Sequence, residues 1–312
     1  MTYKRCQPIY YKPEAGKYFC RDEFIRYFKK RVLKTIQKWK MFERDSRIAV
    51  AVSGGKDSMT LLYVLEEIER DFPSELIIVH LDENIKGYSD VSRDLVRKTA
   101  KKLGLLLYEA SYKELFGYSM DEIANIEREK RIYAACTFCG VWRRWGLNYL
   151  ALKAGADRLA TAHCLDDEAQ TIILNVLKGN LWNILKLDPR PRRIAENVVP
   201  RVKPFREIPE REVTLYAHLM DIPYNDIPCP YATEAMRWNI RLWLAEMERA
   251  HPGTLYNILR FGEKLALLYG NAKTEERINH CEICGFPTVG RICKAHQLKE
   301  HLNKLFSKNK KR

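Results

Sequence analysis

A glycine-rich segment that follows an apolar run is the first place in the chain where the residue types suggest chemistry. Residues 47–53 read as a buried strand, and residues 59–70 read as a helix. Glycine lets the backbone approach an anion closely, and a helix N-terminus offers free N–H groups and the positive end of its dipole. We therefore predict a phosphate-binding loop that lacks the spacing of a Walker P-loop. Its members are Ser53, Gly54, Gly55, Lys56, Asp57 and Ser58.

Cysteines form a second group of chemical interest. Cys136 and Cys139 have the C-x2-C spacing, and Cys229 follows ninety residues later in the string DIPCPY. A C-x2-C pair can bind zinc, bind an iron–sulfur cluster or exchange a disulfide, so this pattern alone leaves all three open.

A third group, near the C-terminus, has a more specific spacing. Cys281 and Cys284 are followed by Cys293 and His296, again as two short chelating pairs. Four such ligands give the closed tetrahedral set of a structural zinc site, and a catalytic zinc is the weaker alternative.

The elements that must position these residues alternate between strand and helix. Apolar runs at 47–53, 76–82, 105–110 and 158–163 are separated by amphipathic helical patterns. This alternation predicts an α/β fold with a doubly wound parallel sheet. On such a sheet a nucleotide lies over the carboxyl ends of the strands, so His80 and His163 are candidates to line its pocket, with core packing as the alternative for each.

The whole chain has 312 residues and a net charge of +14. We expect an N-terminal segment with a basic amphipathic helix at 1–42, a catalytic domain with a helical C-terminal part at 43–275, and a zinc ribbon with a basic tail at 276–312. The positive charge favours a polyanionic partner, with nucleic acid ahead of a membrane. No apolar run reaches the length of a membrane span, and the start of the chain does not have the pattern of a signal peptide.

Taken together and in this order, the strings SGGKDS, CTFCG, HCLDDEAQT and CPY resemble the tRNA 2-thiolation family of PP-loop ATP pyrophosphatases. The similarity extends over roughly residues 40–300 and is strongest for the wobble-uridine branch of the cytoplasm and the archaea. It implies that ATP adenylates the 2-oxygen of a tRNA uridine and that sulfur then replaces that oxygen.

The resemblance also implies roles for residues. Cys136, Cys139 and Cys229 would hold a 4Fe–4S cluster, with Cys136 and Cys229 acting in catalysis. A persulfide on one cysteine is the alternative to the cluster, and zinc or a plain thiol pair is another. Asp167 aligns with the family's catalytic aspartate, which would deprotonate the base or position Mg²⁺, and Lys56 would act on ATP. The structural alternative for the acidic residues 166–168 is that they begin a helix and complement its dipole.

The implied partners are tRNA and a ubiquitin-like sulfur carrier or another sulfide donor, in the cytoplasm, and a homodimer is one option for the assembly. Thiolation of a T-loop uridine or of a cytidine is the alternative within the family. A zinc-ribbon RNA-binding protein with an inactive nucleotide site, and a PP-loop enzyme that makes a small metabolite, are alternatives of other classes.

The N-terminus departs from the family pattern. Relatives carry two cysteine pairs before the basic helix, whereas here Cys6 and Cys20 each stand alone, with Ile9 and Glu23 at the paired positions. We expect no N-terminal zinc site, or a degenerate one, and Cys6 and Cys20 either pair with each other or remain free.

Overall fold

A parallel sheet of five strands forms the centre of the molecule. The computed structural model describes residues 7–70, 72–130, 132–185, 187–234, 236–269 and 279–309. The strands lie in the order β5-β4-β3-β6-β7, and all neighbours are parallel. Their bounds are β3 (Arg47–Ala51), β4 (Glu75–Asp82), β5 (Leu106–Ser111), β6 (Arg158–Ala160) and β7 (Arg201–Val202). The predicted α/β class and the parallel sheet are confirmed, and the edge strand β7 is an addition.

Alternate side chains of the central strands enter two different cores, as expected for a sheet that is covered on both faces. Ile48 and Val50 pack with α1 (Arg21–Lys38), α2 (Lys56–Glu69), α3 (Ser89–Leu103) and α9 (Glu210–Leu219). On the opposite face, Ala49 packs with α4 (Tyr112–Phe116), α5 (Met120–Lys130), α6 (Ala135–Lys153) and α12 (Lys294–Asn309). The strand order reverses beside β3, which places the switch point of the sheet above the glycine-rich segment.

The predicted basic helix is α1, and it shares the core of the sheet. Phe24, Phe28 and Val32 recur every four residues and are fully buried. Its basic side chains engage acids of the central domain: Lys29 with Glu67 at 2.6 Å, Lys38 with Glu207 at 2.7 Å, and Arg31 with Glu212. These cations are therefore matched within the chain, which fits a structural helix better than a phosphate-binding one.

The start of α1 explains one departure from the family pattern. The Glu23 carboxylate accepts a hydrogen bond from the Cys20 backbone N–H at 3.2 Å, in a capping box. Glu23 thus caps the helix. Cys20 is disulfide-bonded, and the expectation for Cys6 lies outside the described residues. A hairpin of β1 (Tyr10–Lys12), η1 (Pro13–Ala15) and β2 (Lys17–Phe19) precedes the helix.

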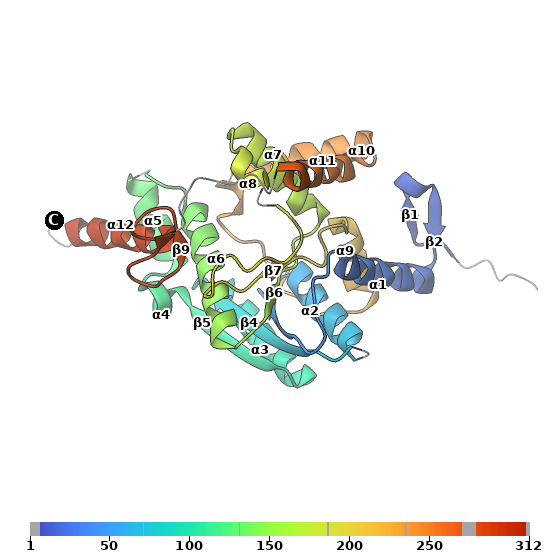
Figure 1. Cartoon of the computed structure of the whole chain (residues 1–312), viewed down its shortest axis with the longest axis horizontal. Helices are drawn as coiled ribbons and strands as arrows, with labels where there is room; N and C mark the ends of the chain where they lie inside the picture. The colour runs from blue at the N-terminus through green and yellow to red at the C-terminus, as the bar shows by residue number, and fades with distance from the viewer. Residues whose placement is uncertain are drawn as a thin grey trace, which may run out of the picture.

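Two further groups of elements flank the sheet (Figure 1). The helices α7 (Leu165–Leu177), α10 (Met236–Ala250) and α11 (Thr254–Tyr269) share a third core and lie at the top of the view with α8 (Leu181–Leu185); the short η2 (Ala232–Glu234) precedes α10. The hairpin of β8 (Asn279–His280) and β9 (Pro287–Thr288) lies with α12 at the left. Within the described residues, no helix is both long enough and apolar enough to cross a membrane.

Candidate active site and metal centres

The glycine-rich segment forms a tight loop between β3 and α2. The Ser58 hydroxyl accepts the Ser53 backbone N–H at 3.0 Å and donates to the Gly55 carbonyl at 2.9 Å, and it lies 3.1 Å from the Ser53 hydroxyl. These bonds close the loop on itself just before the first turn of α2. The loop therefore presents the helix N-terminus to any anion above it.

Gly54 is required by both its conformation and its surroundings. Its φ is +83°, and a Cβ at this position would stand 2.9 Å from the Cβ of Ser92. Asn225 braces the same point from outside: its backbone N–H donates to the Gly54 carbonyl at 2.8 Å, and its side-chain amide donates to the Ser92 hydroxyl at 2.9 Å. The loop is thus fixed between α3 and the segment that leads to Cys229.

Lys56 faces α9. Its ammonium lies 2.9 Å from Asp57, 3.3 Å from Glu210 and 2.7 Å from the Thr214 hydroxyl. Burial lowers the pKa of Lys56, but the carboxylates of Asp57 and Glu210 outweigh it, so the pKa is raised and the ammonium keeps its charge. The nucleotide and catalytic roles predicted for Lys56 stay predictions.

A cavity of about 330 Å³ opens beside the loop, at the carboxyl ends of the strands. Fourteen residues line it, and five of them are predicted site residues: Ser53, Asp57, Ser58, His163 and Asp167. The others are Ala51, Val52, Leu81, Glu83, Arg143, Leu147, Thr161, Ala162 and Arg237.

His163 contributes a neutral imidazole to this cavity. Its Nδ1 lies 3.0 Å from the Thr161 hydroxyl. Burial, and then the charge of Lys203, lowers the pKa of His163 to about 4 against the opposing effect of Asp167. At neutral pH this side chain can therefore form one hydrogen bond with a ligand without adding a charge to the cavity.

His80 takes a different position. It is buried, with its Nδ1 2.8 Å from the Val52 carbonyl, and it does not line the cavity. This position fits the alternative of core packing, in which the imidazole holds the end of β3 against β4.

Two aspartates begin α7 and do different things. Asp167 lines the cavity and accepts the Cys164 backbone N–H at 3.1 Å, and its carboxylate lies 3.6 Å from Arg237. Asp166 turns away and accepts the backbone N–H of Glu210 at 2.7 Å; burial raises the pKa of Asp166 to about 6. Asp167 is thus both a helix cap and a member of the cavity wall, and its catalytic role stays a prediction. Cys164, which precedes α7, is buried, with 2% of its surface exposed.

The three motif cysteines lie next to this cavity. Cys136 and Cys139 are one turn apart on α6, and both of them and Cys229 are partly buried against the core on the α6 face of the sheet. Arg143 joins them to the cavity: its guanidinium donates to the Cys139 sulfur at 3.3 Å and to Glu83 at 2.7 Å. The cavity that contains the phosphate loop therefore ends within one side chain of a cysteine.

The three thiols share one electrostatic environment. Cys136 and Cys139 lie one turn apart on α6, and the charges of Cys139, Arg143 and Glu83 all act on Cys229. Thiolates grouped in this way are ligands of iron–sulfur clusters and of zinc.

The C-terminal set is compact. The ligand atoms of Cys281, Cys284, Cys293 and His296 all lie within 4.8 Å of one another, with the Cys284 and Cys293 sulfurs 3.8 Å apart. This is the separation that one tetrahedral zinc requires. Gly285, at φ +69°, allows the turn after Cys284, and His296 comes from the first turn of α12.

Sequence reasoning missed Glu83 and Asn225. Glu83 could have been found, because it directly follows β4 and so reaches the same edge of the sheet as the loop. Asn225 has no such signal, since its role depends on a long-range contact with Gly54.

The comparisons with known proteins agree with this geometry. Residues 26–247 match the family model of the PP-loop domain. Among curated relatives, tRNA 2-thiolation protein NcsA of Haloferax volcanii is 38% identical over 304 residues, which covers 92% of this chain and 94% of the relative. Cytoplasmic tRNA 2-thiolation protein 1 of Schizosaccharomyces pombe is 33% identical over 314 residues, covering 97% and 92%.

Among solved structures, the U34-tRNA thiolase NcsA from Methanococcus maripaludis, with its [4Fe-4S] cluster, matches with a TM-score of 0.81. It is 30% identical, and the match covers 97% of each chain. The chain belongs to the tRNA 2-thiolation family of PP-loop proteins.

Proposed function

We propose that this protein is an ATP-dependent tRNA sulfurtransferase that replaces the 2-oxygen of the wobble uridine by sulfur. The observation that carries the proposal is the cavity shared by the phosphate loop, Asp167 and Arg143, because Arg143 also contacts the Cys139 sulfur. Activation by ATP and delivery of sulfur need to meet at one carbon atom, and Arg143 connects the wall of this cavity to Cys139 through a single side chain. The similarity to thiolases over nearly the whole chain supports it.

In the first step, the backbone N–H groups around Ser53–Ser58 would hold the ATP phosphates. Asp57 and Asp167 supply the carboxylate oxygens that Mg²⁺ prefers, and both line the cavity. The uracil 2-oxygen attacks the α-phosphorus, a new O–P bond forms, the bond to the β-phosphate breaks and pyrophosphate leaves. Asp167 would accept the N3 proton of the uracil, and His163 would stay neutral beside it.

In the second step, sulfide attacks C2 of the adenylated base, the C–S bond forms and AMP leaves with the former 2-oxygen. Cys136, Cys139 and Cys229 would hold a 4Fe–4S cluster, which supplies a nucleophilic sulfur when it is bound. Arg143 would neutralise negative charge between Cys139 and Glu83. Coulombic attraction to these two groups raises the pKa of Arg143 well above its usual range, so it stays charged throughout.

The remaining partners follow from the same proposal. Cys281, Cys284, Cys293 and His296 would hold one structural Zn²⁺. The sulfur would come from a ubiquitin-like carrier or another sulfide donor, and the reaction would take place in the cytoplasm, where the S. pombe relative is named to act. A homodimer remains an option for the assembly.

The test uses anaerobically purified protein, ATP, sulfide and tRNA transcripts in which single uridines are changed to cytidine. We expect thiolation and AMP release with the unchanged transcript, and their loss when the wobble uridine is replaced. Loss on replacement of the T-loop uridine instead would assign the protein to the other branch. ATP binding without AMP release in the presence of tRNA would favour the RNA-binding alternative.

Cys136→Ala should abolish thiolation and lower the iron content while ATP still binds. Thr137→Ala is the matched control, because Thr137 lies between the two cysteines on α6 and does not line the cavity. Thiolation that survives in Cys136→Ala at the level of the control would remove the three cysteines from the mechanism.

A further inference from the structure

A second, larger cavity of about 500 Å³ lies between three walls: α6, the segment before β7, and the β8–β9 hairpin with the start of α12. Asn148 joins the first two walls: its amide donates to the Asn197 carbonyl at 2.9 Å and accepts the Val199 backbone N–H at 2.9 Å. Trp142 joins the third, because its indole donates to the Ala295 carbonyl at 3.1 Å. These bonds fix the walls relative to one another, so the cavity is preformed.

Positive charge dominates this cavity. Four of its sixteen lining residues are cations and none is an anion, while the rest are mostly apolar. The cations are Arg144, Arg192, Arg201 and Lys294. Arg192 pairs with Asp188 at 2.7 Å, but Asp188 is also shared with Arg190. Within the described part of the chain, no carboxylate lies within salt-bridge distance of Arg144 or Arg201.

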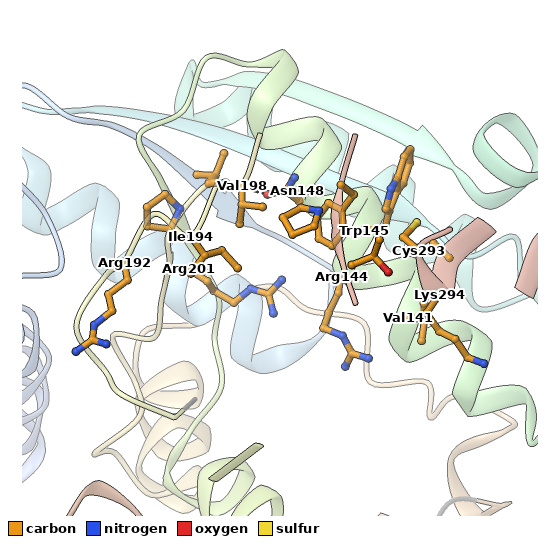
Figure 2. A pocket seen from close by; sticks show the side chains of 16 residues that line it. Val141, Arg144, Trp145, Asn148, Arg192, Ile194, Val198, Arg201, Cys293 and Lys294 are labelled. Atoms are coloured by element: carbon orange, nitrogen blue, oxygen red, sulfur yellow. Dashed lines mark hydrogen bonds between the residues drawn. The ribbon is translucent and has the colours of Figure 1, made fainter. Parts of the chain in front are cut away.

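Arg201 is the most telling of these residues. Its Nε is buried and has no hydrogen-bond partner among the described residues. Burial, and then the charge of Arg144, lowers the pKa of Arg201 to about 10. Figure 2 shows the two guanidinium groups reaching into the same part of the cavity, Arg201 from β7 and Arg144 from α6. Two neighbouring cations without an anion oppose folding, which indicates that an anion is bound there in the working protein.

The position of the cavity indicates which anion. Burial, and then the charge of Arg237, lowers the pKa of Arg144, so the positive charge of Arg237 acts on Arg144. Arg237 lines the nucleotide cavity, as does Arg143, the residue before Arg144. A line of cations therefore leads from Arg201 through Arg144 to the reaction site. A continuous polyanion can follow such a line, whereas an isolated small anion gains nothing from its continuation.

We propose that this cavity holds a nucleotide of the tRNA that flanks the uridine being modified, with its phosphate between Arg144 and Arg201. The base would lie against the apolar wall near Trp145 and Phe286, since stacked or apolar contact is how proteins hold unpaired bases. This assignment rests on the proposed function for the identity of the RNA. It places the β8–β9 hairpin in contact with the substrate, which accounts for the position of this hairpin beside α6.

The experiment compares Arg144→Gln and Arg201→Gln with Lys98→Gln, which removes the same charge from an exposed position on α3, across the sheet from the cavity. The probe is an unmodified tRNA transcript with a wobble uridine, and its Kd is measured by fluorescence anisotropy over a range of salt concentrations. Each cavity variant should bind roughly tenfold more weakly than the control. The slope of log Kd against log salt should fall in magnitude by about 0.7 for each arginine lost.

A stability readout separates binding from folding. Without RNA, Arg201→Gln should melt no lower than the wild type, because the change removes an unpaired buried cation. A marked drop in its melting temperature, with Arg144→Gln binding tRNA as the control does, would make both arginines structural and overturn the proposal. The mononucleotide UMP is titrated in parallel. If the two substitutions weaken the binding of UMP but leave the Kd for tRNA unchanged, the site binds a free nucleotide and the proposal fails.

The binding test of this cavity and the thiolation test of the proposed function can fail independently. If the wild type thiolates tRNA while both variants bind it as tightly as the control, the cavity assignment fails and the proposed function stands. If tRNA binding depends on Arg144 and Arg201 while no thiolation occurs, the reverse holds.

Discussion

Replacing Gly54 by alanine tests the geometry of the phosphate loop, and Gly87 provides a matched control. Both glycines have a left-handed φ, +83° and +75°, but a Cβ at Gly54 would meet Ser92 at 2.9 Å whereas one at Gly87 would meet nothing within 4 Å. The backbone conformation costs an alanine about 1–2 kcal/mol in either place. The collision adds about 1–3 kcal/mol at Gly54 alone, because Ser92 is buried on α3 and its backbone cannot move away freely.

We therefore expect Gly54→Ala to lower the free energy of unfolding by about 2–5 kcal/mol and Gly87→Ala by about 1–2 kcal/mol. The assays are calorimetric unfolding and titration with ATP. The loop can relieve part of the collision by moving, but ATP then has to restore the original loop conformation in order to bind. If this costs about 1.4 kcal/mol, the Kd for ATP rises about tenfold in Gly54→Ala. ATP binding to Gly87→Ala should be unchanged. Equal destabilisation of the two variants, with ATP binding intact in both, would refute the assignment of Gly54 as a position fixed by Ser92.

Three further predictions concern stability and pH. Glu212→Gln should destabilise by about 3–5 kcal/mol, because Glu212 is fully buried and holds both Arg31 and Lys12, whereas Glu66→Gln, at an exposed pair with Arg70, should cost at most about 1 kcal/mol in the same urea titration. The folded pKa of His163 is about 4, below its ordinary 6.5, so the unfolded chain takes up the proton first and this group destabilises the fold as pH falls from about 6.5 to 4. The stability of the wild type relative to His163→Gln should thus decrease over that window, and a difference that does not change with pH contradicts the buried neutral imidazole. If the proposed zinc site is correct, His296→Ala should contain less zinc than the wild type and melt at a lower temperature, while the exposed His251→Ala should match the wild type; equal zinc content in both variants would exclude His296 as a ligand.

Much of the fold is readable from the sequence, because buried parallel strands are continuous apolar runs. The four runs at 47–53, 76–82, 105–110 and 158–163 correspond to β3, β4, β5 and β6. The strand β7 has no such run: Arg201–Val202 follows a segment rich in proline and arginine, and it is a strand only because β6 pairs with it. Local pattern cannot anticipate an element that tertiary pairing creates.

The site divides in the same way. The glycine-rich loop and the four residues Cys281, Cys284, Cys293 and His296 are short strings, so their spacing alone predicts that the members of each set come together. The side chain of Lys56 could not be placed, since its direction depends on Glu210 and Thr214, more than 150 residues away. The pairing of Arg143 with Glu83 also depends on how α6 packs over the end of β4, which no local pattern specifies.

The helix α6 links the cysteine pair to the C-terminal Cys/His set. Cys136 and Cys139 stand in its first two turns, and Trp142, on the next turn, donates to the Ala295 carbonyl, next to His296. If the proposed cluster and zinc occupy these two sets, loss of the zinc would disturb a contact that α6 makes one turn from Cys139. Oxidation of the C-terminal cysteines would then impair sulfur delivery even when every residue that lines the catalytic pocket is intact.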